Sequence, residues 1–200
     1  MRGRAASVLS RALLVILFAG FAWANFQRWR VTGEPSGLGT TLLEAWVAVL
    51  FVVRRPTAQV SSRRLAWAAA PVGSFAMLLA RPASGGLPEL YCEALQLVGV
   101  AVALLSLGTL GRSFGIVAAN RGVKTQGPYR LVRHPAYFGY LISYLAYVAE
   151  NPSSVNVVLL LVSTGAQIVR MEEEERMFVG DPAYSEYLTR VPRRLIPFVY

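Results

Sequence analysis

The sequence predicts an all-α fold: a polytopic transmembrane helical bundle of about five to six spans, with a pocket facing the cytoplasm. Three observations support this fold class. Hydrophobic residues make up 54% of the 200-residue chain and charged residues only 16%, whereas soluble domains have about 25% charged residues. Apolar runs recur at lengths suited to ~30 Å of hydrocarbon, and basic residues collect in alternate connections between those runs.

Each apolar run predicts one span, and the runs are taken in chain order. The first follows basic residues and contains "AWA" just before Asn25, so it also resembles a secretory signal with a cleavage site. Five further spans follow, which favours a retained first span. The short, turn-rich segment "VAENPSSV" predicts that the last two spans form a hairpin. The predicted spans are Val8–Phe26, Leu38–Val53, Leu65–Ala80, Leu90–Gly111, Pro135–Ala149 and Ser154–Val169.

The distribution of the basic residues predicts the orientation of the bundle. With six spans, 17 of the 20 Lys and Arg residues fall on one side, in segments 1–11, 54–64, 111–134 and 170–200. The positive-inside rule places that side in the cytoplasm. The net charge of +9 therefore sets topology, and we expect no nucleic-acid partner. A lone cysteine, Cys92, excludes an intramolecular disulfide and a thiolate metal cluster, and we expect no metal site.

The chain divides near Gly111 into two regions. Residues 1–110 are hydrophobic spans joined by short loops, whereas residues 111–200 hold the long polar segments. Both polar segments fall on the predicted cytoplasmic side and are joined by the helical hairpin. We therefore expect them to meet in space and to form the functional region.

The stretch "RHPAYFGY" contains the only histidine, His134. Pro135 is favoured at the first position of a helix, which places His134 at the cap. The N–H groups of Ala136, Tyr137 and Phe138 are then expected to be unpaired at the cytoplasmic interface. A helix start of this kind can hold a carboxylate or a phosphate.

Basic and aromatic residues surround that helix start. Arg130 and Arg133 would attract an anion, and Tyr129 and Tyr137 offer ring faces to a cation or a planar base. The alternative interpretation is topological, with charged residues ending a span and tyrosines anchoring it at the interface. The residues alone leave both interpretations open.

A second cluster, "RMEEEER", ends the last span. Arg170 and Glu174 stand four residues apart on one helix face, which is also the spacing of an ordinary helical ion pair. Four consecutive glutamates at a membrane boundary indicate a functional site. Some of these carboxylates are expected to have a positive partner, namely Lys124, Arg133, Arg176 or a cationic ligand.

S-adenosylmethionine fits a site that combines a helix N-terminus, aromatic faces and carboxylates. It carries a carboxylate, an ammonium, a sulfonium, an adenine and a ribose diol. A nicotinamide cofactor has phosphates that favour a more basic site. Neither "GEPSGLG" nor "GTLGRSFG" matches the glycine-rich fingerprint of soluble nucleotide-binding folds.

Three ordered blocks, "GPYRLVRHPAYFGY", "RMEEEER" and "DPAYSEYLTRVPRRLIP", closely resemble the isoprenylcysteine carboxyl methyltransferase family. That family belongs to a wider group of integral membrane methyltransferases that includes the phospholipid N-methyltransferases. The resemblance covers residues 106–200, and the compact chain is similar to prokaryotic members. The shared pattern comprises Arg133, His134, Pro135, Tyr137 and Gly139, with Glu173 and Glu174.

The resemblance implies roles for individual residues within a methyltransferase-like catalytic region, residues 111–200. Arg170, Glu174 and Tyr137 are implied as catalytic residues, and Arg170 also as the residue facing the substrate. The eukaryotic branch has histidine at Arg121 and glutamine at Phe114, so the prenylcysteine acceptor does not follow from the resemblance. The implied cofactor-binding residues are Arg121, Gly122, Val123, Lys124, Tyr129, His134, Pro135, Ala136, Tyr137, Glu173 and Glu174.

The resemblance implies a multi-pass protein of a prokaryotic cell membrane that transfers a methyl group from S-adenosylmethionine. The acceptor would be lipophilic, either a prenylcysteine-like carboxylate or another isoprenoid or lipid, and would enter from the bilayer. An amine or hydroxyl acceptor would need a glutamate or Tyr137 to take its proton. The alternatives are an NADPH-dependent membrane reductase of the sterol-reductase type and a non-enzymatic membrane protein.

Overall fold

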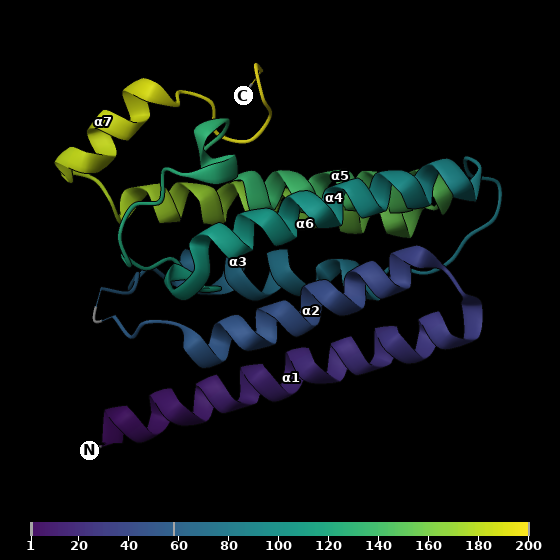
Figure 1. Ribbon diagram of the computed structural model, residues 1–200, viewed down its shortest axis with the longest axis horizontal. Coiled ribbons are helices and arrows are strands. Elements are labelled where there is room, and N and C mark those ends of the chain that lie inside the picture. Colours follow the sequence, from purple (N-terminus) through teal and green to yellow (C-terminus); the bar gives the residue numbers. More distant parts are fainter. Residues whose placement is uncertain (1, 58, 200) are drawn as a thin grey trace.

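The computed structural model describes residues 2–57 and 59–199, and over these residues it is helical without a named strand (Figure 1). This architecture confirms the predicted all-α fold. Five of the six predicted spans each lie on one α-helix, whereas Leu65–Ala80 covers an α-helix and the 3-10 helix that follows it. The elements are α1 (Arg2–Thr32), α2 (Pro35–Val53), α3 (Arg64–Phe75), η1 (Ala76–Leu79), α4 (Glu89–Leu110), η2 (Gly111–Ser113), η3 (Gly127–Arg130), α5 (Pro135–Glu150), α6 (Ser154–Arg176) and α7 (Pro182–Arg190).

Four helical segments are long and apolar enough to cross a membrane: Val8–Thr32, Pro35–Val53, Glu89–Ser113 and Ser154–Arg176. The apolar segment that α3 and η1 form together, Arg64–Leu79, is shorter. Helix α5 has 16 residues. At 1.5 Å per residue, α5 extends about 24 Å, less than the ~30 Å of hydrocarbon. The count of five to six spans therefore stays a prediction.

The connections 54–64 and 111–134, which are predicted to lie on one side, are hydrogen-bonded to each other at one end of the bundle. The Arg55 N–H donates to Arg112 O at 2.8 Å, and the Ser61 N–H donates to Ala118 O at 2.9 Å. At the opposite end, the Leu87 N–H donates to Ala149 O at 2.8 Å. The chain thus alternates between two ends, as the distribution of basic residues requires.

Two glycines bring the backbones of α4 and α5 into close contact (Figure 1). A Cβ atom added to Gly99 would lie 2.5 Å from Gly139 O, and one added to Gly139 would lie 2.5 Å from Gly99 O. Small residues permit such contacts between membrane helices, where packing drives association. The contact fixes α5 against α4.

An aromatic core joins the first two helices to the connection after α4. Phe51 on α2 is fully buried, and its ring is stacked on Phe18 of α1 with centroids 5.6 Å apart. Phe114 packs against the same ring edge-on at 5.2 Å. Offset and edge-on aromatic pairs are favourable beyond the area they bury. The core therefore anchors the segment that begins at Phe114.

The chain after α7 docks on the start of α5. The Arg133 N–H donates to Arg193 O at 3.0 Å, and the His134 N–H donates to Arg194 O at 2.8 Å. Helix α7 lies outside the bundle of long helices (Figure 1). Its first turn is capped by Asp181, whose carboxylate accepts a hydrogen bond from the Ala183 N–H at 2.9 Å, as a helix cap does.

Candidate active site

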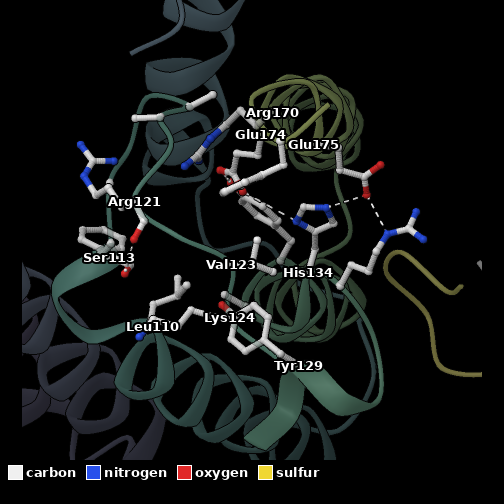
Figure 2. Close-up of a pocket in the computed structure, with 18 of the residues that line it drawn as sticks. Leu110, Ser113, Arg121, Val123, Lys124, Tyr129, His134, Arg170, Glu174 and Glu175 are labelled. Atoms are coloured by element: carbon white, nitrogen blue, oxygen red, sulfur yellow. Dashed lines mark hydrogen bonds and ion pairs between the residues drawn. The ribbon is translucent and has the colours of Figure 1, made fainter. Parts of the chain in front are cut away.

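A pocket lies where the connection after α4, the start of α5, the end of α6 and α7 meet (Figure 2). Its cavity volume is about 130 Å³. We call it the end pocket. Its lining includes Phe114, Arg121, Gly122, Val123, Lys124, Tyr129, His134, Ala136, Tyr137, Tyr140, Arg170, Glu174, Glu175, Phe178, Tyr184 and Tyr187.

Glu175 connects three segments at the pocket. Its Oε1 lies 2.9 Å from Arg133 Nε and 3.0 Å from His134 Nε2, and its Oε2 lies 3.1 Å from Arg194. Charge-assisted hydrogen bonds of this kind are the strong ones. Glu175 thus holds the tail and the His134 ring in place, and its oxygens are already paired.

Glu174 is the carboxylate with capacity for a ligand. It accepts a hydrogen bond from the Tyr137 hydroxyl, and its Oε2 lies 3.7 Å from His134 Nδ1. Its side chain is 29% exposed, against 13% for Glu175. A carboxylate offers about four lone-pair sites, so Glu174 can accept further hydrogen bonds in the pocket (Figure 2).

Glu173 and Pro135 lie outside the pocket lining. Glu173 Oε1 lies 2.7 Å from Arg63 and 3.5 Å from Arg176, and the side chain is 3% exposed. It therefore ties α6 to the start of α3. Pro135 is buried at the first position of α5. The two carboxylates at the pocket are Glu174 and Glu175, and sequence reasoning did not single out Glu175.

The start of α5 differs in one respect from expectation. The Phe138 N–H donates to His134 O at 3.2 Å, which is the first intrahelical bond of α5, so the expectation of an unpaired Phe138 N–H is wrong. The reason is the position of the cap: with His134 as N-cap, the fifth residue closes the first turn. The N–H groups of Ala136 and Tyr137 precede that bond, and both residues line the pocket.

Arg170 contacts Tyr137 instead of forming the ordinary helical ion pair with Glu174. Its guanidinium lies over the Tyr137 ring, 5.1 Å from the centroid. It also donates to Ser74 Oγ and to Ile116 O, each at 3.1 Å. Tyr137 is therefore held from two directions, by Arg170 at its ring and by Glu174 at its hydroxyl.

The segment 121–124 forms the cationic side of the pocket, and all four of its residues line it (Figure 2). Gly122 has a φ of +89°, a conformation that disfavours side chains. Burial and the neighbouring Arg54 lower the pKa of Arg121, while the negative charge of Glu174 acts in the opposite direction. The cationic segment therefore faces the carboxylate.

Tyrosines form a wall that was only partly expected. The Tyr187 hydroxyl donates to Tyr129 O at 2.7 Å, and burial raises the pKa of Tyr187 to about 12. Tyr184 and Phe178 extend the wall, with ring centroids 5.2 Å apart. Sequence reasoning named Tyr129 and missed the others, although Tyr184 and Tyr187 are three residues apart on one helix face.

The pocket lies at one end of a helical fold in which four helices are long and apolar enough to cross a membrane. The family model for phospholipid methyltransferases matches residues 90–181, from α4 to the residue before α7. This match confirms the resemblance seen in the sequence: over that segment the chain is similar to the family of membrane methyltransferases. No curated protein matches the chain.

Proposed function

We propose that the protein transfers a methyl group from S-adenosylmethionine to a lipophilic acceptor at the end pocket. One observation supports this proposal most directly. Glu174 is a carboxylate that can accept further hydrogen bonds. It lines the same pocket as the cationic segment 121–124 and the tyrosine wall. The methyl donor presents the complementary set of charges and a planar base.

The donor set of the pocket fits the cofactor group by group. Glu174 would accept from the ammonium or the ribose diol. The N–H groups at the start of α5, together with Lys124, would hold the carboxylate. The tyrosine faces would take the adenine and the sulfonium.

When bound, S-adenosylmethionine supplies a methyl group on a sulfonium, which leaves as a neutral thioether. The protein would contribute mainly orientation, which can account for much of the rate of such a transfer. Arg170 and Glu174 hold Tyr137 at the pocket, so these three residues would position the reacting groups. A carboxylate acceptor would need no base, whereas an amine or hydroxyl would give its proton to Tyr137 or a glutamate.

The proposed location is a prokaryotic cell membrane, with the end pocket and the C-terminus in the cytoplasm. The support is the 17-to-3 division of basic residues between the two ends, which obeys the positive-inside rule. The bilayer and a lipophilic acceptor are the proposed partners.

The test is calorimetric titration of the protein in lipid nanodiscs with S-adenosylhomocysteine. We expect saturable binding by wild type and a loss of at least about tenfold in affinity for Glu174→Gln, because a charged hydrogen bond partner is removed. Glu172→Gln is the matched control, since Glu172 is on the same helix but does not line the pocket. Absence of binding by folded wild type, with binding of NADPH instead, would support a reductase.

A further inference from the structure

A second cavity lies inside the helical bundle, and we call it the central cavity. Its volume is about 320 Å³, against 130 Å³ for the end pocket. Residues from α1 through α6 line it, and Phe114, Tyr140 and Arg170 border both cavities. A molecule in the central cavity would therefore lie next to the end pocket.

Two residues of opposite charge line the central cavity, and each has an unpaired atom. Among the described residues, Glu44 Oε2 and Arg170 Nε are the two buried side-chain oxygen or nitrogen atoms without a hydrogen bond partner. The other Arg170 nitrogens donate to neutral oxygens of Ser74, Gln167 and Ile116. Buried polar groups are nearly always paired, so such exceptions point to a missing partner.

The depth of Glu44 in the bundle follows from the contact between α2 and α4. These helices run in the same direction, because the connections that follow them are hydrogen-bonded to each other. A Cβ atom added to Gly39 would lie 3.6 Å from Val100 Cγ1. At about 1.5 Å per residue, Glu44 lies about 7.5 Å beyond that contact along α2, and Ala103 lies about 4.5 Å beyond it along α4. Glu44 is therefore level with the turn of α4 that follows Ala103.

Arg170 lies at nearly the same depth. A Cβ atom added to Gly139 would lie 2.7 Å from Ala103 N, so the first turns of α5 pack beside that part of α4. The Arg170 guanidinium lies over the ring of Tyr137, which is less than one turn from Gly139. Along the bundle, Glu44 and Arg170 are thus about one helical turn apart or less. Both unpaired atoms are at the level where the two cavities meet.

The missing partner has to satisfy a carboxylate and a guanidinium at once. Glu44 needs a donor, and Arg170 needs an acceptor. An ammonium would meet repulsion from Arg170, and a carboxylate would meet repulsion from Glu44. Glu34 and Glu150, which also line the cavity, already have partners. A hydroxyl both donates and accepts and adds no charge, so it is the group that fits both atoms.

Two arguments favour a hydroxyl carried by an aromatic ring. Tyr140 and Tyr144 line the cavity with their rings stacked, the centroids 6.3 Å apart, and aromatic rings pair favourably beyond the area they bury. The other argument is acidity. A phenol has a pKa of about 10, whereas an aliphatic hydroxyl is about as weak an acid as water, with a pKa of about 15.7. A carboxylate can act as the base for a phenol far more readily.

We propose that the central cavity binds a neutral lipophilic phenol as the methyl acceptor, with Glu44 as its proton acceptor and Arg170 as the donor to its oxygen. This inference rests on the proposed methyltransferase function. In the transfer, the phenol gives its proton to Glu44, and an oxygen lone pair bonds the methyl carbon while the carbon–sulfur bond breaks onto sulfur. The Arg170 N–H stabilises the negative charge that develops on the oxygen. The products are an aryl methyl ether and a neutral thioether, and Glu44 then loses the proton to solvent.

The test uses three probes with the same ring and chain: 4-octylphenol, 4-octylbenzylamine and 4-octylbenzoate. Binding isotherms are recorded on protein in uncharged phosphatidylcholine nanodiscs, with empty nanodiscs subtracted. We expect wild type and the control Glu172→Gln to bind the phenol at least about tenfold more tightly than either charged probe. Glu44→Gln should bind the benzoate about tenfold more tightly than wild type does, and Arg170→Gln should gain affinity for the benzylamine to the same extent. These opposite gains cannot arise from misfolding.

Methyl ether formation from 4-octylphenol and S-adenosylmethionine is measured on the same samples by mass spectrometry. We expect it in wild type and a loss of about 100-fold in Glu44→Gln, as when a general base is removed. Wild type that prefers a charged probe, or Glu44→Gln that keeps full methyl transfer, would overturn the proposal.

S-adenosylhomocysteine binding separates this proposal from the proposed function. We expect Glu44→Gln to bind it as wild type does. Wild type that binds it without a preference for the phenol would overturn the phenol site alone. A phenol preference in protein that binds no S-adenosylhomocysteine would overturn the proposed function while supporting the phenol site.

Discussion

The end pocket and the central cavity differ in how their charged residues are satisfied. At the end pocket, Glu175 is paired with Arg133, His134 and Arg194. In the central cavity, Glu44 has a buried oxygen with no partner. A pocket built from paired charges is formed before a ligand arrives, whereas a cavity with an unpaired charge depends on its ligand.

The two cavities are formed by different kinds of contact. The end pocket is organised by contacts between segments distant in sequence, including the tail. The central cavity is organised by helix packing, and Glu44, the lining carboxylate with an unpaired buried oxygen, lies within a span. We therefore expect substitutions that disturb one cavity and leave the other intact.

The largest expected effect is at the border of the two cavities. Arg170→Ala removes a guanidinium that contacts Tyr137 and lines both cavities. We expect methyl transfer to fall about 100-fold, as when a preorganised donor is lost, with little change in the affinity for S-adenosylhomocysteine. Arg170→Lys keeps the charge and is the control. Equal loss of both readouts would contradict the assignment of Arg170 to the acceptor side.

The next largest effect concerns the helix contact on which both cavities depend. Gly139→Ala places a Cβ against the backbone of α4, and we expect a destabilisation of about 1–3 kcal/mol from overpacking. The measurement is the apparent melting temperature in detergent. Gly108→Ala on α4 meets no atom within 4 Å and should not lower stability.

Glu175→Gln should affect the end pocket alone. Losing the carboxylate weakens its contacts with Arg133 and Arg194, so the tail should be cleaved faster in limited trypsin digestion. The affinity for S-adenosylhomocysteine should fall a few-fold, while 4-octylphenol binding is unchanged. Glu186→Gln is the control, because that side chain is 71% exposed. Unaltered cleavage would show that the tail is held by other contacts.

The smallest effect is expected at Gly122. Gly122→Ala places a side chain at a φ of +89°, which costs about 1–2 kcal/mol for an L-residue in the left-handed region. We expect roughly a twofold weaker affinity for S-adenosylhomocysteine, measured by calorimetry. Gly122→Asn should be less affected, because asparagine tolerates positive φ better.

The helices could be predicted because bilayer thickness and hydrophobicity determine them locally. The pairing of Ser61 with Ala118 could not, because it depends on backbone hydrogen bonds between separate connections. The domain division at residue 110 and the roles of the site residues stay predictions.

The site was predictable only to within one turn of a helix. Four consecutive glutamates are each rotated by about 100° around α6, so their partners decide which of them faces the pocket. Glu173 forms an ion pair with Arg63, whereas Glu174 accepts a hydrogen bond from the Tyr137 hydroxyl. Glu44 could have been identified from the sequence, because it is the only charged residue within the apolar run Leu38–Val53.

The docking of residues 193 and 194 on the start of α5 has a consequence for synthesis. Arg133 and His134 receive their backbone partners from these two residues, so the ribosome has to complete them before the site can close. A nascent chain that has already inserted α1 to α6 still lacks that closure. The order of translation therefore makes the end pocket assemble after the six preceding helices.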